Sequence, residues 1–196
     1  MILGITGGLG CGKSTAARAF EQRGFRRLDS DQIVRDLVLT DPEVMAVLRA
    51  RYGDAVISSE GGRVSVNRPA LAERVFSNDA ERLWLEELTH PRVFEQWRKA
   101  FAAEPGARWA VEVPLLHEKG VENWFDFTIC VACAPAQQLA RLEQRGLSRV
   151  LAGQRISKQL PLAQKIERSD YVLWNEGSAR FLEAQVDHLA AALSAN

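Results

Sequence analysis

The segment Gly7-Gly-Leu-Gly-Cys-Gly-Lys-Ser14 constrains the fold of this chain more than any other feature, because it matches the pattern G-x-x-x-x-G-K-[ST] directly after an apolar stretch. Its glycines permit positive φ angles and close backbone approach, so successive amide groups can turn inward on a phosphate. A helix that begins at Lys13 would point its N-terminal N–H groups, and the positive end of its dipole, at the same anion. The segment therefore predicts a phosphate-binding turn that joins a buried strand to a helix.

Residues of this turn are predicted to bind a nucleoside triphosphate and its metal ion. Lys13 would reach the β- and γ-phosphates, and the Ser14 hydroxyl would hold Mg²⁺. A glycine-rich turn that binds nothing is the alternative, and the flanking strand and helix argue against it. A dinucleotide fingerprint would need a third glycine at position 13, where Lys13 stands. The predicted nucleotide-binding residues are Gly8, Leu9, Gly10, Cys11, Gly12, Lys13, Ser14 and Thr15.

Apolar runs alternate with segments of helical period over much of the chain. Strands are predicted at 1–6, 25–28, 109–113, 127–132 and 171–174, and helices at 13–23, from the acidic turn up to 39, and at 179–193. This alternation favours an α/β fold in which helices cover both faces of a parallel sheet. A length of 196 residues suits one domain with room for a small insertion.

Two stretches interrupt the alternation. Residues 41–104 are almost wholly helical, apart from the turn-rich Ser58-Ser-Glu-Gly-Gly62, and are predicted to form a helical insertion. Residues 141–168 are helical and carry seven Lys and Arg against two Glu, which suits a lid over an anionic ligand. The core of the single chain 1–196 is then expected at about 1–40, 107–140 and 169–196.

The chain as a whole is neutral, with 25 Lys and Arg against 25 Asp and Glu, which argues weakly against a nucleic-acid or membrane-surface binder. No run approaches 18 apolar residues and the N-terminus has no basic leader, so neither a membrane span nor a signal peptide is expected. Three cysteines are too few for a disulfide scaffold, so a cytoplasmic protein is predicted. No feature of the sequence indicates an obligatory protein partner.

Further segments resemble one family along nearly the whole chain, in order and in spacing. The chain contains three segments that resemble motifs of the dephospho-coenzyme A kinases. They are Leu28-Asp-Ser-Asp31 with Ile33-Val-Arg35, Val113-Pro-Leu-Leu116 with Glu118, and Ser169-Asp-Tyr-Val172 with Asn175. The helical insertion of that family is similar to Arg68-x-x-Leu71, Val75-Phe76 and His90-Pro91.

This resemblance implies a P-loop kinase fold of the nucleotide-kinase type, with a core sheet, a helical substrate-binding insertion and a helical lid. It also implies a phosphotransferase with an alcohol group as acceptor. The reaction would be ATP plus 3′-dephospho-coenzyme A (dephospho-CoA) giving ADP plus coenzyme A, the last step of coenzyme A biosynthesis.

The acceptor of that reaction, a ribose 3′-hydroxyl, needs a carboxylate to orient it or to take its proton. Asp31 is the predicted catalytic residue, because it follows a short strand at the edge where α/β sheets place their sites. Its alternative is an N-cap for a helix that begins near Gln32. Asp29 is the weaker candidate. Arg35, one helical turn after Asp31, is predicted to bind a substrate phosphate, with a structural ion pair as its alternative.

Arginines of 141–168 are predicted to close over the phosphates. Arg141 and Arg145 are four residues apart and would act as catalytic residues by stabilising charge on the transferring group, with a solvated basic face as the alternative. Arg149 is a weaker candidate. The resemblance further implies that Arg68, His90 and Glu118 bind the substrate and that Asn175 borders the adenine; His90 beside Pro91 has capping of a broken helix as its alternative.

The chain departs from the family pattern at Ser30, Glu112 and His117. Glu112 stands at a strand end where Asp is common in the family. It is interpreted either as a residue that assists Mg²⁺ through water or as a solvated carboxylate.

The cysteines offer one further hypothesis. Cys130 and Cys133 have the spacing of a zinc or redox pair, but they lie in an apolar strand without further ligands and are interpreted as buried structural thiols. Cys11 lies in the phosphate loop near a helix N-terminus, which lowers the pKa of a thiol. Oxidation or alkylation of Cys11 is therefore expected to block ATP binding.

The sequence thus predicts an ATP-dependent dephospho-CoA kinase that uses Mg²⁺. Two alternatives stay open. One is another small-molecule, nucleoside or nucleotide kinase with the same loop, and the other is a regulatory module that binds ATP without transferring its phosphate.

Overall fold

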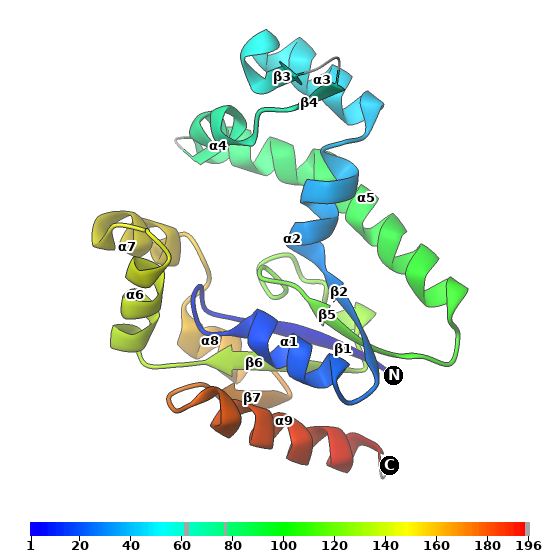
Figure 1. Ribbon diagram of the computed structural model, residues 1–196, viewed down its shortest axis with the longest axis vertical. Helices are drawn as coiled ribbons and strands as arrows, with labels where there is room; N and C mark the ends of the chain where they lie inside the picture. The colour runs from blue at the N-terminus through cyan, green and yellow to red at the C-terminus, as the bar shows by residue number, and fades with distance from the viewer. Residues whose placement is uncertain (61–62, 77, 195–196) are drawn as a thin grey trace. The chain divides into compact units, whose positions relative to one another are not determined.

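The computed structural model describes residues 1–60, 63–76 and 78–194 (Figure 1). The chain divides into two compact units. The first comprises Met1–Asp29 and Gly106–Asn196, and the second is the intervening Ser30–Pro105. The second unit therefore begins at Ser30, whereas the sequence analysis starts the insertion at 41.

A five-stranded parallel sheet forms the centre of the first unit. Its order is β2-β5-β1-β6-β7. The strands are β1 (Ile2–Gly7), β2 (Phe25–Asp29), β5 (Arg108–Glu112), β6 (Phe127–Ala132) and β7 (Tyr171–Trp174). Because the strands are parallel, all five carboxyl ends meet at one edge, where α/β folds place their ligands.

Helices cover both faces of this sheet, so the α/β prediction is confirmed. On one face α1 (Lys13–Glu21) and α9 (Ala179–Ser194) pack on each other, and Phe20 and Leu182 are buried against Leu3 and Ile5. Alternate side chains of a strand point to opposite faces. Thr6 therefore faces the other side, where α8 (Leu162–Glu167) packs on β1 and β6.

Short segments complete the first unit. A 3₁₀ turn (Glu122–Trp124) precedes β6, and α6 (Pro135–Gln144) and α7 (Arg149–Ser157) follow it. Gly4 in the middle of β1 is required by packing, because a Cβ there would lie 2.6 Å from the Phe125 ring and 2.7 Å from Leu116. Gly146, at φ 84°, follows the end of α6.

The second unit is mainly helical. It comprises α2 (Ser30–Ile33), a π-helix η1 (Val34–Val38), α3 (Pro42–Tyr52), a 3₁₀ turn η2 (Asp54–Val56), α4 (Arg68–Phe76) and the 25-residue α5 (Asp79–Ala103). The side chain of Asp41 caps α3, and that of Asn78 caps α5.

The turn-rich part of this unit differs from the prediction. Strands β3 (Ile57–Glu60) and β4 (Arg63–Val66) form an antiparallel pair where the sequence analysis expects only a turn. Residues 61 and 62 of the predicted turn lie outside the described residues. The β-branched Ile57, Val64 and Val66 favour extended structure, and pairing with a partner strand outweighs the serines and glycines between them.

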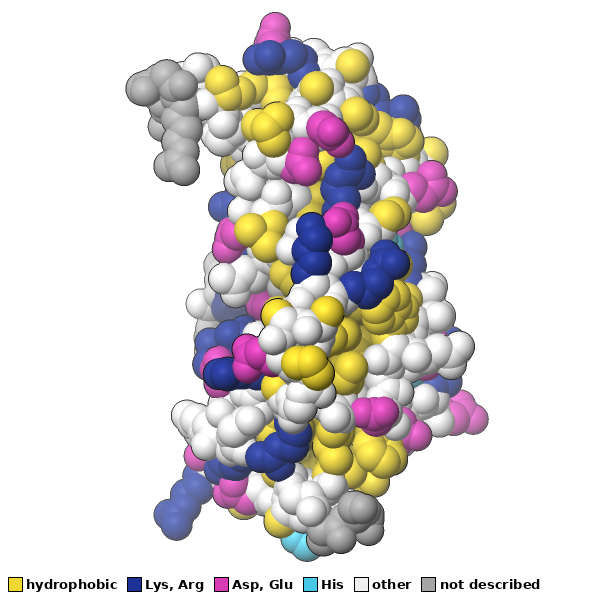
Figure 2. Space-filling model, turned by 90° about the vertical axis from the view of Figure 1, so that its right-hand side faces the viewer, with side chains coloured by type: hydrophobic (Ala, Val, Ile, Leu, Met, Phe, Trp, Pro, Cys, Tyr) yellow, Lys and Arg dark blue, Asp and Glu magenta, His cyan; other side chains and the backbone are white. Residues whose placement is uncertain are grey.

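Figure 2 shows charged side chains of both signs interspersed over the face that it draws. In the described parts of the chain, no helix is long and apolar enough to cross a membrane.

Candidate active site

The glycine-rich turn between β1 and α1 adopts the conformation that its sequence predicts. Gly7, Gly10 and Gly12 have φ angles of 139°, 81° and 100°, in the region that favours glycine. A Cβ on Gly7 would lie 2.1 Å from the carbonyl oxygen of Val131, and one on Gly12 would lie 2.2 Å from Nδ2 of Asn175. Both the backbone angles and the close approach of Val131 and Asn175 therefore require glycine at these two positions.

The N-terminus of α1 opens onto this turn. Gly12 is the N-cap residue, no described side chain caps the helix, and its first turn contains no acidic residue. Such an end presents backbone N–H groups and a partial positive charge to an anion. Lys13 adds a full positive charge, and its Nζ lies 3.2 Å from the carbonyl oxygen of Gly7 and 3.0 Å from that of Gly8. The ammonium group is thus held over the turn.

Asn175 and Arg141 join the turn from two other segments. Asn175 follows β7, is 7% exposed, and donates from Nδ2 to the carbonyl oxygen of Cys11 at 2.9 Å. Arg141, in α6, donates from one terminal nitrogen to the backbone oxygen of Asn175 at 2.9 Å and to its Oδ1 at 3.3 Å. The other terminal nitrogen of Arg141 is buried without a hydrogen-bond acceptor among the described residues. An anionic ligand would satisfy it.

Arg145 is placed differently from Arg141. Helix α6 ends at Gln144, so Arg145 is the C-cap residue and is exposed. Arg149 is the first residue of α7 and is exposed as well. Of the three predicted lid arginines, the structure brings Arg141 to the phosphate loop.

Two carboxylates lie side by side at the carboxyl ends of β2 and β5. Asp29 pairs in register with Glu112, and Arg27 bridges them at 3.2 Å and 2.6 Å respectively. Glu112 is 3% exposed. The interpretation of Glu112 as a solvated carboxylate is therefore wrong, because the sheet buries it and Arg27 neutralises its charge.

Glu118 is held by a residue that the sequence analysis missed. Lys165, in α8, is fully buried, and its Nζ lies 2.8 Å from Oε1 of Glu118 and donates to the carbonyl oxygen of Pro114 at 2.7 Å. The same Oε1 accepts from the backbone N–H of Leu160 at 2.9 Å. The Val113–Leu116 segment is thereby fastened to 160–165, within the predicted lid.

His117 makes polar contacts with two further residues of the first unit. Its Nδ1 lies 2.9 Å from Oε1 of Glu122, and its Nε2 lies 2.9 Å from the hydroxyl of Ser169. Burial raises the pKa of the Glu122 carboxyl, but the hydrogen bond from His117, a backbone hydrogen bond and the charges of His117 and Arg168 together lower it overall. His117, which departs from the family pattern, thus makes two side-chain hydrogen bonds.

All predicted acceptor-side residues except Glu118 and the weaker candidate Asp29 lie in the second unit. Asp31 is exposed in the first turn of α2, which begins at Ser30, so Asp31 is not the N-cap of a helix that starts near Gln32. Arg35 forms an ion pair with Asp36 at 2.9 Å. Its hydrogen bond holds the pKa of the Asp36 carboxyl below the usual range, and Arg68 contributes at longer range. The structure therefore brings Arg35 and Arg68 into the neighbourhood of one carboxylate.

His90 does not cap a broken helix. Helix α5 runs continuously through Pro91, and the His90 ring packs on Phe94 with centroids 6.1 Å apart.

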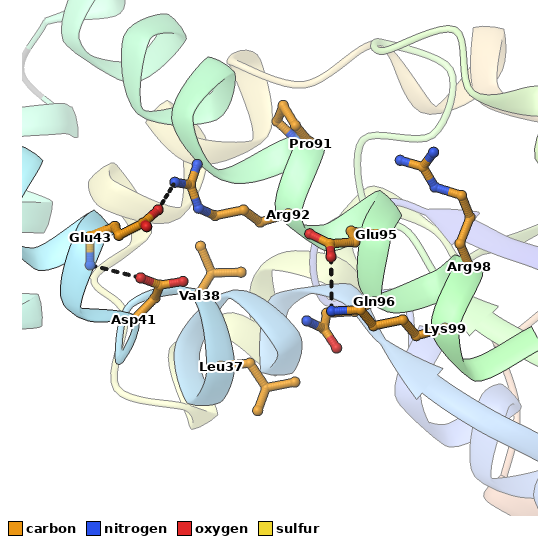
Figure 3. Close-up of a pocket in the computed structure, with 10 residues that line it drawn as sticks. All are labelled: Leu37, Val38, Asp41, Glu43, Pro91, Arg92, Glu95, Gln96, Arg98 and Lys99. Atoms are coloured by element: carbon orange, nitrogen blue, oxygen red, sulfur yellow. Dashed lines mark hydrogen bonds and ion pairs between the residues drawn. The ribbon is translucent and has the colours of Figure 1, made fainter. Parts of the chain in front are cut away.

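A groove of about 850 Å³ lies within this unit, between η1 and α5 (Figure 3). It contains two ion pairs, Arg92 with Glu43 at 3.7 Å and Lys99 with Glu95 at 2.8 Å. None of the predicted residues Arg35, Arg68 and His90 lines it. Two of the three cations that line the groove, Arg92 and Lys99, are thus paired with carboxylates.

Comparisons with known proteins assign this combination of phosphate loop and flanking motifs to one family. A sequence profile described as dephospho-CoA kinase matches residues 1–180. The chain belongs to the dephospho-CoA kinase family. A curated dephospho-CoA kinase of Thermosynechococcus vestitus is 42% identical over 187 residues, which cover 94% of this chain and 91% of that protein. One from Corynebacterium efficiens is 35% identical, with 96% and 95% covered.

Solved structures agree with this assignment. A crystal structure of a Thermus thermophilus protein matches with a TM-score of 0.82 and 33% identity, covering 98% of this chain and 97% of that one. The dephospho-CoA kinase from Campylobacter jejuni matches with a TM-score of 0.71 at 22% identity, covering 98% and 96%, and supports the fold alone. The predicted family, the P-loop kinase fold and the ATP-dependent kinase activity toward dephospho-CoA are therefore confirmed.

Proposed function

We propose that this dephospho-CoA kinase transfers the γ-phosphoryl group of ATP to the ribose 3′-hydroxyl of dephospho-CoA through the residues assembled around the loop 7–14. The observation that carries the proposal is Lys13, whose ammonium group is held over a glycine turn at the uncapped end of α1. Phosphoryl transfer needs positioning and charge neutralisation more than covalent chemistry. A turn of this kind supplies both.

The nucleotide would lie with its phosphates against residues 8–15. The backbone N–H groups of the turn and of the first turn of α1 would donate to phosphate oxygens, and Lys13 would move from the carbonyl oxygens of Gly7 and Gly8 to the β- and γ-phosphates. Asn175 holds the turn by the carbonyl oxygen of Cys11, close to where the adenine is proposed to lie.

The donor set suits Mg²⁺. Ser14, the second residue of α1, offers a hydroxyl oxygen beside the loop, and the described residues contain no cluster of three or more His, Cys, Asp or Glu that would form an all-protein cage. Mg²⁺ is typically bound through one or two protein oxygens, waters and substrate phosphates. When bound, the ion would neutralise charge on the β- and γ-phosphates.

The acceptor side is proposed on Asp31 and its neighbours. Asp31 follows β2 by two residues and would orient the 3′-hydroxyl or take its proton. Arg35, Arg68, His90 and Glu118 are proposed to bind the substrate. For Glu118 the contact with Lys165 makes this role one of positioning the segment 113–118.

The lid is proposed to comprise residues 141–168, above a core of about 1–40, 107–140 and 169–196, with 41–104 as the substrate-binding insertion. The buried terminal nitrogen of Arg141 would donate a hydrogen bond to a phosphate oxygen. Arg145, just beyond the end of α6, would approach the same phosphates. Together they would stabilise the charge on the transferring group.

We also propose a cytoplasmic location, supported by three cysteines that are all unbridged. The proposed partners are the two small-molecule substrates, without nucleic acid, membrane or an obligatory protein.

The deciding experiment measures ADP release by the purified full chain with ATP and Mg²⁺, with and without dephospho-CoA. We expect release that depends on dephospho-CoA, with coenzyme A as the second product. Release with a nucleoside or nucleotide from a matched panel, but not with dephospho-CoA, would assign another kinase activity. ATP binding without release for any acceptor would indicate a regulatory module.

A further inference from the structure

Two of the three thiols meet beneath the phosphate loop. Cys133 directly follows β6, and its thiol donates to Sγ of Cys11 across an Sγ–Sγ distance of 3.3 Å. Cys11 is fully buried and Cys133 is 1% exposed. Cys133 is therefore not merely a packing residue of the strand, because it is the hydrogen-bond partner of a side chain in the ATP loop.

The contact shifts the pKa values of the two thiols in opposite directions. Accepting the hydrogen bond from Cys133 lowers the pKa of the Cys11 thiol to about 7, with the Lys13 ammonium adding to the effect and burial opposing it. The bond to Cys11 and burial raise the pKa of Cys133. The main cause for Cys11 is thus the neighbouring thiol rather than the helix N-terminus that the sequence suggests. The thiolate, which is the nucleophile in thiol oxidation, forms on Cys11.

Cys130 provides the contrast. It is buried in β6, and burial raises the pKa of its thiol to about 12. A group that stays protonated at neutral pH is a poor nucleophile.

We propose that Cys11 and Cys133 form a site of reversible oxidative modification, in which a disulfide between them disables the phosphate loop for ATP. The second half of this proposal rests on the proposed role of the loop as the ATP site, and the first half does not.

Hydrogen peroxide, a small oxidant, serves as the co-reactant. The Cys11 thiolate attacks one peroxide oxygen, so that an S–O bond forms, the O–O bond breaks and hydroxide leaves to be protonated to water. Once Cys11 is a sulfenic acid, Cys133 no longer faces the thiolate that raises its pKa, and it gives its proton to the leaving hydroxide as it attacks the Cys11 sulfur. The S–S bond forms, the S–O bond breaks and a second water leaves. Two thiols lose two electrons and two protons in total, and one peroxide becomes two waters.

The disulfide affects the loop through its backbone. An S–S bond is about 2.05 Å long, so Sγ of Cys11 must approach Cys133 from 3.3 Å. The loop is closely packed around this side chain, since even a Cβ on Gly8 would lie 2.7 Å from Sγ of Cys11. The carbonyl oxygen of Cys11 also accepts a hydrogen bond from Asn175. Movement of Cys11 therefore turns the peptide groups that the phosphates require, and we expect ATP affinity to fall at least tenfold.

The site itself is tested by treating the full chain with hydrogen peroxide and determining mass and free thiols after unfolding without reductant. We expect one remaining thiol, Cys130, the loss of two hydrogen atoms, and a peptide cross-link between Cys11 and Cys133 that dithiothreitol reverses. Three unmodified thiols, a cross-link through Cys130 or a bond between two chains would overturn the proposal.

Matched variants separate the pair from general oxidation. Cys133→Ser removes the partner sulfur and should form no intramolecular disulfide, whereas Cys130→Ala should form it as the unaltered chain does. A disulfide in Cys133→Ser, or its absence in Cys130→Ala, would contradict the assignment of the pair.

The effect on ATP is measured by calorimetric titration of reduced, oxidised and re-reduced protein. We expect at least a tenfold weaker Kd after oxidation, restored by dithiothreitol, in the unaltered chain and in Cys130→Ala. A disulfide that leaves the Kd unchanged overturns the second half of the proposal. Reduced protein that binds no ATP is instead a failure of the proposed function, while the mass measurement still decides whether the disulfide forms.

Discussion

Nδ2 of Asn175 donates a 2.9 Å hydrogen bond to the carbonyl oxygen of Cys11, across 164 positions of sequence. This one bond connects the end of β7 to the centre of the phosphate loop, and Arg141 binds Asn175 from the other side. An arginine of α6 and the glycine-rich loop therefore contact the same side chain, that of Asn175.

Replacement of Asn175 should loosen that loop. In Asn175→Ala the buried carbonyl oxygen of Cys11 loses its donor, which costs about 1–3 kcal/mol when a buried group is left unsatisfied. We expect a rise of about tenfold in the KM for ATP, which corresponds to about 1.4 kcal/mol, with a smaller change in the KM for dephospho-CoA. Steady-state kinetics with each substrate varied in turn measures both. Equal effects on the two substrates, or no effect, would contradict a role at the ATP loop.

Lys13 should matter more for turnover than for folding. Its ammonium group would neutralise charge on the transferring phosphate, so we expect Lys13→Ala to lower kcat by roughly 10³, or about 4 kcal/mol of barrier. Arg18→Ala is the control, because Arg18 lies on the exposed side of the same helix α1. Turnover of Lys13→Ala close to that of Arg18→Ala would refute the assigned mechanism.

The sequence predicts the sheet and the loop well because both are encoded locally. The apolar runs at 127–132 and 171–174 coincide with β6 and β7, and the glycines at 7, 10 and 12 carry the positive φ angles of the turn. Signals of this kind depend only on residues that are close in sequence, so a short segment is enough to reveal them.

Contacts between distant segments could not be predicted in this way. Lys165 resembles any polar helical residue in sequence, and its buried ammonium group donates to the carbonyl oxygen of Pro114, 51 positions away. The contact of Cys133 with Cys11 spans 122 positions. The β3–β4 pair could not be predicted for a related reason, since the propensity of a strand's own residues is weaker than the effect of pairing with a partner strand.

Asp31 provides a test of the acceptor side. Asp31→Asn keeps the shape of the side chain but removes its negative charge, so we expect ATP affinity to stay within about twofold while kcat falls by roughly 10²–10⁴, the usual contribution of a general base. Asp54→Asn, which removes an exposed carboxylate of the same structural unit, is the control and should change neither. A fully active Asp31→Asn enzyme would reduce Asp31 to a residue of the first turn of α2.

The second unit contains a pH-sensitive contact. Hydrogen bonds from Arg51 and Tyr52 lower the pKa of the Glu81 carboxyl from 4.5 to about 2. Because the folded-state pKa is the lower one, the stabilisation is fully present above about pH 4.5 and is lost as the pH falls toward 2. We expect Glu81→Gln to reduce Tm at pH 7 and to have progressively less effect between pH 4.5 and 2.

Thermal unfolding monitored by circular dichroism across this range measures the difference. Glu87→Gln, on the exposed side of the same helix, is the control. A Tm difference for Glu81→Gln that stays constant down to pH 2 would show that the pair with Arg51 does not set the acid dependence.

The most destabilising single change should be at Lys165. Its ammonium group is fully buried against Glu118, whose Oε2 is buried without another partner among the described residues. Lys165→Met leaves that carboxylate uncompensated, and removal of one member of a buried ion pair costs about 3–5 kcal/mol. Denaturant unfolding of the full chain measures this loss, and Lys158→Met, an exposed change at the end of α7, should alter stability by less than about 0.5 kcal/mol.

The reason for the loss is tested by a second substitution. Glu118→Gln added to Lys165→Met removes the stranded charge but retains an oxygen that can accept from the backbone N–H of Leu160. The double variant should therefore be more stable than Lys165→Met alone. If the double variant is no more stable, the cost of Lys165→Met lies in packing and not in an unpaired carboxylate.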